Sequence, residues 1–116
     1  MLDKKTKNYI ISALRRINKW DKRRHQVLRN NKLERNCYLC SKCKELFGHK
    51  DVALDHIEPV VPITGFTTWD SFIERLFCDE SGYQVLCKVC HKVKTQSENS
   101  DRRAVLKGLK DPAPQS

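Results

Sequence analysis

The dipeptide Asp55-His56 and the histidine His91 are the residues of this sequence whose types are best suited to chemistry. Adjacent residues on a strand point to opposite faces, so an Asp-His pair there can hold a metal with one side chain and address a water molecule with the other. An imidazole titrates near neutral pH and can accept a proton from that water. The set indicates metal-assisted hydrolysis. Against this, an Asp-His dipeptide is common, and His91 could instead be a further zinc ligand or a bystander.

Two C-x-x-C pairs, Cys40/Cys43 and Cys87/Cys90, are separated by 43 residues. Four thiolates in a tetrahedral array form a closed structural zinc site, which leaves no open position for a substrate. Such a site holds the fold together rather than doing chemistry. Because His91 directly follows Cys90, the second pair also fixes where His91 points.

The six cysteines also allow other arrangements. Secreted proteins use paired cysteines for disulfides, whereas intracellular proteins more often use them as metal ligands. The first residues do not resemble a secretory signal, and no run of about 18 apolar residues could span a membrane, so we expect a cytoplasmic zinc protein. Cys37 and Cys40 also form a C-x-x-C pair, and spacing alone does not decide between Cys37 and Cys43. Cys78 is expected to be a buried apolar thiol.

Two short strands are needed to position the Asp-His pair. Val52 to Leu54 predict a strand that leads into Asp55-His56 and ends at Glu58-Pro59, since proline cannot continue a ladder. Residues 83–86 predict the second strand, and a helix is expected to begin near His91. Between the strands, a short helix is predicted, capped by Thr67 or Thr68, whose apolar residues pack in the core: Trp69, Phe72, Ile73, Leu76 and Phe77.

Two helices are predicted before the first cysteine. Residues 4–18 have the apolar periodicity of a helix, and Asp21 is a good N-cap for a second helix that runs to about Arg29. At the other end of the chain, residues 102–110 predict a basic helix and residues 111–116 a disordered tail. The expected apolar anchors of the first two helices are Ile10, Leu14, Ile17, Trp20, Val27 and Leu28.

The positive charge is concentrated in the N-terminal third. Residues 1–36 hold 12 basic and 3 acidic residues, and the rest of the chain holds 11 of each, so the whole net charge of +9 lies in that segment. This predicts binding to a phosphate backbone, although a solvated helix surface would look the same. We divide the 116 residues into a basic helical extension (1–36), a zinc-bearing core (37–99), and a C-terminal helix and tail (100–116).

Several motifs together resemble one family. Tyr38-x-Cys40-x-x-Cys43, Leu54 to Val60 and Gln84 to Thr95 look like the zinc-bearing HNH endonucleases, which have a ββα-metal core. The segments Gly65 to Phe77 and Ala13 to Trp20 resemble a phage-encoded branch of that family. The likeness covers roughly residues 9–98 and implies an α+β fold with an N-terminal helical extension.

The resemblance also implies the roles of the site residues. Family members place eleven residues between the second knuckle cysteine and the Asp-His pair, which fits Cys43 and leaves Cys37 spare. Asp55 and His91 would bind a catalytic divalent metal, Mg²⁺ or Mn²⁺ with Co²⁺ or Ni²⁺ also possible. His56 would be the general base. The products would carry a 5′ phosphate and a 3′ hydroxyl, and one site would cut one strand.

One departure from the family concerns Gly82. The family often has an asparagine at this position, nine residues before the final histidine. That asparagine helps to orient the general base. Its absence here leaves the backbone of residues 81–83, or another side chain, to hold His56.

DNA is the expected partner of a monomer or weak dimer found in a bacterial host cytoplasm. Lys94 is three residues from His91 on one helical face and could contact a phosphate, whereas Glu98 is expected to be a solvated carboxylate. A zinc-stabilised DNA-binding module without chemistry is the alternative, but it does not explain the Asp-His pair; a protein-interaction module fits the basic segment poorly. The residues expected to bind DNA are Arg15, Arg16, Lys22, Arg23, Arg24 and Lys94.

Overall fold

The chain begins with two helices that have side-chain caps. The computed structural model describes residues 2–108. Helix α1 (Lys4–Asn18) is capped by Asp3, and α2 (Lys22–Asn30) by Asp21, whose carboxylates accept hydrogen bonds from backbone N–H groups of the first turn. Both helices have the extents that periodicity and capping predicted, because each cap satisfies a backbone donor that the helix leaves unpaired.

The inward face of α1 differs from the predicted one at its end. Leu14 packs inward, as expected, against the buried cluster of Val60, Phe72 and Leu76, but Ile17 is 57% exposed and Trp20 is 81% exposed. The residue that points inward in the last turn is Asn18, which is only 2% exposed. Trp20 lies in the turn between the helices, so its predicted role as an anchor was wrong; Val27 is the buried residue of α2.

Two small antiparallel sheets follow. Strands β1 (Lys32–Glu34), β2 (Cys37–Leu39) and β3 (Leu46–Phe47) form the first sheet, which the sequence pattern had not indicated. Strands β4 (Val52–His56) and β5 (Tyr83–Cys87) form the second, with Asp55 opposite Gln84 and His56 opposite Tyr83. The second sheet therefore brings the Asp-His pair beside the segment that carries the second cysteine pair.

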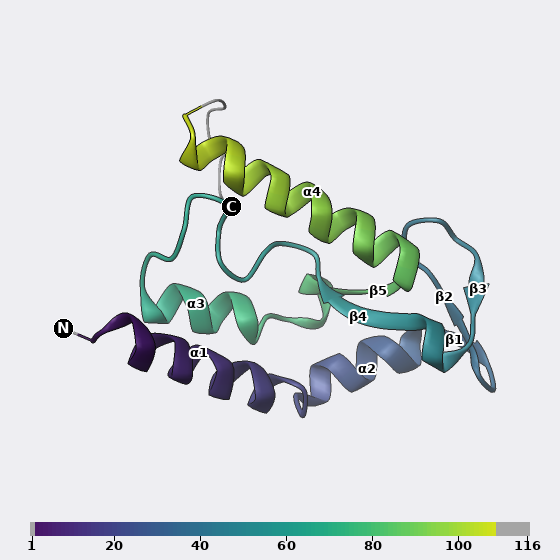
Figure 1. Ribbon diagram of the computed structural model, residues 1–116. Coiled ribbons are helices and arrows are strands. Elements are labelled where there is room, and N and C mark those ends of the chain that lie inside the picture. The colour runs from purple at the N-terminus through teal and green to yellow at the C-terminus, as the bar shows by residue number, and fades with distance from the viewer. Residues whose placement is uncertain (1, 109–116) are drawn as a thin grey trace.

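The remaining helices flank the second sheet (Figure 1). Helix α3 (Trp69–Leu76) is capped by Thr68, and α4 (Lys88–Leu106) follows β5 directly. Short 3₁₀ turns lie at His49–Asp51 (η1) and Glu80–Gly82 (η2). Helix α4 begins three residues before His91 because Cys87 caps it: its Sγ accepts a hydrogen bond from Cys90 N. The basic stretch predicted as a separate helix continues α4 as far as Leu106, and residues 109–116, including the predicted tail, lie outside the described part.

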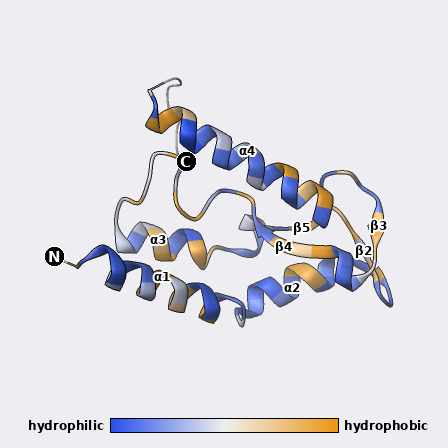
Figure 2. Cartoon of the chain, viewed as in Figure 1, coloured by the Kyte–Doolittle hydropathy of each residue, from blue (hydrophilic) through white to orange (hydrophobic). Residues whose placement is uncertain are grey.

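The core is divided into three small clusters rather than one. One lies between α2 and β5, one around the cysteines, and one between α1, α3 and the loop after β4. Figure 2 shows hydrophobic residues along the paired strands and long hydrophilic stretches on α1, α2 and α4. None of the described helices is both long and apolar enough to cross a membrane. A core this thin makes additional cross-linking by a metal valuable. Its buried residues are Val27, Tyr83, Val85, Cys40, Leu86, Cys87, Val60, Phe72 and Leu76.

Candidate metal and active site

Four cysteines gather where the two sheets meet. The sulfur atoms of Cys40, Cys43, Cys87 and Cys90 all lie within 4.8 Å of one another, and none of these cysteines forms a disulfide. Cys37 lies in β2 and is not part of the cluster. This group could bind a metal such as zinc, which takes four thiolates in tetrahedral geometry.

The environment of the cluster favours thiolates. Burial opposes ionisation of Cys40, but backbone N–H groups of Cys43, Cys87 and Lys42 outweigh it and lower the pKa of that thiol to about 6. The pKa of Cys90 is raised to about 12, first through its side-chain hydrogen bond with Cys87. One thiolate thus forms readily while its neighbours resist further charge, and a dication in the centre would relieve that repulsion.

Asp55 and His91 come together across the sheet and the first turn of α4. Asp55 Oδ1 lies 3.6 Å from His91 Nε2, and Asp55 Oδ2 accepts a hydrogen bond from Gln84 at 3.1 Å. Ligands of one metal stand about 2.0–2.2 Å from the ion, so neighbouring donors are roughly 3 Å apart. The spacing and the oxygen–nitrogen donor set fit a shared divalent cation, with the second carboxylate oxygen held by protein donors.

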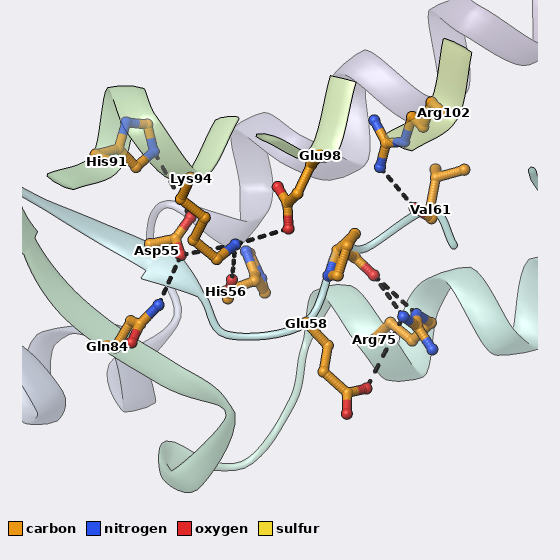
Figure 3. A network of polar contacts seen from close by, with 11 residues as sticks. Asp55, His56, Glu58, Val61, Arg75, Gln84, His91, Lys94, Glu98 and Arg102 are labelled. Atoms are coloured by element: carbon orange, nitrogen blue, oxygen red, sulfur yellow. Dashed lines mark hydrogen bonds and ion pairs between the residues drawn. The ribbon is translucent and has the colours of Figure 1, made fainter. Parts of the chain in front are cut away.

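Lys94 links the carboxylates of this region (Figure 3). Its Nζ lies 3.1 Å from Asp55 Oδ2 and 2.9 Å from Glu98 Oε2, and it also donates to the carbonyl of His56 at 3.0 Å. Burial disfavours the ammonium, but hydrogen bonds to Glu98 and Asp55 raise the pKa of Lys94 nonetheless. Glu98, expected to be solvated, therefore belongs to the polar network through Lys94.

His56 is fixed by a backbone carbonyl. Its Nε2 lies 2.8 Å from Leu76 O, at the end of α3, and its ring lies against that of Tyr83 with centroids 4.9 Å apart. A carbonyl can only accept, so the neutral ring carries its hydrogen on Nε2 and keeps the lone pair of Nδ1. Burial lowers the pKa of His56, which favours this neutral form.

The same carbonyl is the centre of a buried network from α1 and β5. Asn18 Nδ2 donates to Leu76 O at 3.0 Å and lies 3.0 Å from Tyr83 Oη. The Tyr83 hydroxyl lies 3.0 Å from Asp21 Oδ2, and burial above all raises its pKa to about 12, so it stays protonated and can donate to that carboxylate. Helix α1 thus helps to hold the carbonyl that orients His56.

Residue 82 has no room for a side chain. A Cβ at residue 82 would stand 2.5 Å from Cys78 Sγ, so the half-buried Cys78 fills the space that a side chain would need. The carbonyl of Gly82 accepts a hydrogen bond from Ile57 N at 2.9 Å. His56 Nε2 contacts the carbonyl of Leu76, and the side chain of Tyr83, one of the residues expected to hold His56, lies against the ring.

The predicted DNA-binding residues are distributed unevenly. A cleft of about 300 Å³ is lined by Arg15 and Arg24 together with Asp55, His56 and His91. Lys94 and Arg15 line an adjoining cleft of about 160 Å³, which shares Asp55 and His56 with the first.

The other basic residues of the set do not line these clefts. Arg23 is paired with the capping Asp21 at 3.1 Å, and Arg16 and Lys22 are exposed on the helices.

Arg102 and the network residues Asn18 and Tyr83 were missed from the sequence. Arg102 lines the smaller cleft, and the helical spacing of 91, 94, 98 and 102 was the signal that could have placed it there once α4 was known to be continuous. Nothing in the sequence pattern marks a backbone carbonyl such as that of Leu76. Comparison of the chain with protein-family models, with curated proteins and with solved structures found no match.

Proposed function

We propose that this protein is a metal-dependent DNA endonuclease of the HNH type, with a structural zinc on the four cysteines. One observation carries the proposal: the Asp55–His91 pair, with atoms 3.6 Å apart, adjoins a histidine whose Nε2 is bound to a carbonyl. That arrangement combines a two-residue cation site with a histidine that keeps a basic nitrogen. The motif resemblance to HNH endonucleases supports the same function independently of the geometry.

The roles of the residues follow from their contacts. A divalent cation at Asp55 and His91 would supply charge stabilisation for the phosphate and for the leaving oxygen. His56 accepts the proton of the attacking water at Nδ1, while the Leu76 carbonyl holds Nε2–H and stabilises the imidazolium that forms. Lys94 holds Asp55 Oδ2 and leaves Oδ1 facing His91.

DNA is the proposed substrate because the clefts around His56 are lined by basic residues. Arg15, Arg24 and Lys94 line these clefts together with the carboxylates of Asp55 and Glu98. Such cations can neutralise a phosphate backbone, and the counterions that the nucleic acid releases favour binding. One site of this kind hydrolyses one strand, so nicking is the expected activity, and a double-strand break needs two nicks or two molecules.

The test is a nicking assay on supercoiled plasmid with Mg²⁺ or Mn²⁺ added and, as a control, with neither. We expect conversion to the open circular form only with added metal, and a ligase-competent 5′ phosphate at the nick. Wild-type protein that contains zinc but cuts under no divalent metal would overturn the nuclease.

A non-catalytic zinc-stabilised DNA-binding module is the second candidate. The observation in its favour is that Lys94 and Gln84 already satisfy Asp55 Oδ2 without a metal. Plasmid binding without nicking would favour this candidate.

A further inference from the structure

The smaller cleft beside His56 contains two arginines from opposite ends of the chain. It has a volume of about 160 Å³ and is bounded by Arg15 of α1, by Arg102 of α4 and by the loop at residues 59–61. It shares Arg15, Asp55 and His56 with the larger cleft, so the two clefts adjoin at the candidate active site.

Arg15 has no acidic partner among the described residues. Its guanidinium lies over the ring of Phe72, 5.9 Å from the centroid, and no hydrogen bond or ion pair to it occurs in residues 2–108. Desolvation first, and then the positive charge of Arg102, lower the pKa of Arg15. Both arginines also line the smaller cleft, so their like charges face one space.

Arg102 is also without a carboxylate partner in the described part of the chain. Its Nη2 donates to the carbonyl of Val61 at 2.7 Å, which fixes the side chain in the cleft, and its buried Nε has no partner there. Glu98 lies one turn earlier on the same face of α4, but its carboxylate binds Lys94 at 2.9 Å (Figure 3). The carboxylate of Glu98 is thus already paired with an ammonium group.

We propose that Arg15 and Arg102 form a clamp for one backbone phosphate of the nucleic-acid strand, next to the phosphate held at Asp55 and His91. This inference rests on the proposed function and adds the path of the substrate. An anion between the two guanidiniums offsets their like charges and can accept hydrogen bonds from Arg15, which makes none within residues 2–108. Guanidinium groups also match a phosphate in bidentate geometry, which lysine does not. The strand would then run from the cleft at Arg24, past His56, toward Arg102.

The clamp is tested by fluorescence anisotropy with a short labelled duplex, without added divalent metal and at several salt concentrations. Arg15→Ala and Arg102→Ala should each weaken binding about tenfold. Each should also reduce the slope of log affinity against log salt concentration by the amount expected for about one lost phosphate contact. The matched controls are Lys5→Ala and Arg103→Ala, which remove one positive charge each from exposed positions of α1 and α4 that line neither cleft. They should change affinity about twofold at most, because neither side chain lines the clefts and salt screens a charge farther from the strand more strongly.

The double variant separates a clamp from two independent contacts. If both arginines hold one phosphate, Arg15→Ala/Arg102→Ala binds little more weakly than either single variant. Equal losses in the cleft variants and their controls, or fully additive losses in the double variant, overturn the clamp. Zinc content and the thermal midpoint of each variant report its folding, and Arg15→Lys, which keeps the charge without the fork, should recover only part of the affinity.

The same proteins distinguish failure of the clamp from failure of the nuclease. A wild type that never nicks, together with selective loss of binding in the cleft variants, leaves the clamp standing and removes the nuclease. A wild type that nicks, together with cleft variants that bind and nick as their controls do, removes the clamp and leaves the nuclease.

Discussion

The Nε2 atom of His56 lies 2.8 Å from the carbonyl oxygen of Leu76, and this one contact determines which nitrogen of His56 is free. The carbonyl must accept, so Nε2 donates and Nδ1 keeps its lone pair. Leu76 is 1% exposed, and its carbonyl also accepts a hydrogen bond from Asn18. The position of this acceptor is therefore fixed by the protein. A backbone carbonyl therefore fixes the orientation of this ring.

The proposed division of roles predicts that His56→Ala separates catalysis from metal binding. Loss of a general base typically slows a reaction by about 10²–10⁴-fold. We expect His56→Ala to lose nicking by that factor while it keeps zinc, fold, DNA affinity and binding of the catalytic metal. Asp55→Ala should lose both nicking and that metal. Plasmid nicking and calorimetric titration with Mn²⁺ measure the two properties.

His25→Ala is the matched control for this pair, because His25 is exposed on α2 and lines neither cleft. It should nick at the wild-type rate. If His56→Ala also does so, the general base is assigned wrongly. If His56→Ala loses Mn²⁺ binding while Asp55→Ala retains it, the two roles are reversed.

Asn18 is predicted to be a residue on which both stability and the position of His56 depend. Asn18→Ala removes the donor to Leu76 O and leaves Arg24, which donates to Asn18 Oδ1 at 3.1 Å, without that acceptor. The expected loss is about 1–3 kcal/mol in the free energy of unfolding, as for other buried hydrogen-bonding groups left unpaired.

Urea denaturation measures that loss, and nicking should fall in kcat more than in KM. Asn8→Ala, at an exposed position of the same helix, is the control and should leave both quantities unchanged. Equal behaviour of the two variants would show that the network contributes nothing. The basic N-terminal segment would then act only through DNA affinity, as its charge alone suggested.

The sequence was most informative where a side chain carries the signal. Asp21, and Thr67 or Thr68, predicted the starts of two helices, and the apolar run from Val52 to Leu54 predicted β4. The cysteine pairs identified the metal cluster for the same reason, since thiol ligands are few and their spacing is regular.

What could not be predicted depends on tertiary contacts. Trp20 was an apolar residue at a plausible spacing, but the turn that places Asn18 inward leaves it 81% exposed. Arg102 could be placed only once α4 was known to run unbroken from Lys88 to Leu106. The three strands of the first sheet are two or three residues long, which is too short for a period-two pattern to show.

Zinc is predicted to be needed for folding and not for the chemical step. Cys87→Ser should lose zinc and cooperative unfolding, because the cluster joins the turn after β2 to the start of α4 across a thin core. Cys37→Ser, outside the cluster, is the matched control and should keep both. Elemental analysis and thermal denaturation measure these outcomes. Zinc-free wild-type protein that unfolds cooperatively at the same temperature would contradict a structural zinc.

Gly82 and Cys78 are predicted to be energetically coupled. A Cβ at residue 82 would stand 2.5 Å from Cys78 Sγ and 2.9 Å from Cys78 Cβ. Gly82→Ala must therefore push the turn that follows α3 away from β5. Overpacking of this kind costs about 1–3 kcal/mol. Gly82→Asn should destabilise the fold more than Gly82→Ala does, so an asparagine at this position should not improve nicking.

Cys78→Ala removes the closer of the two obstructing atoms and should therefore recover part of the stability that Gly82→Ala loses. In a double-mutant cycle by urea denaturation, we expect the combined loss to be smaller than the sum of the single losses. Gly48→Ala is the matched control: its Cβ would meet nothing closer than 3.4 Å, and that contact is the end of the Asn36 side chain. Gly48→Ala should lower the free energy of unfolding only slightly, and that loss should be the same with or without Cys78→Ala. Additive losses at Gly82 and Cys78 would mean that something other than this contact keeps residue 82 a glycine.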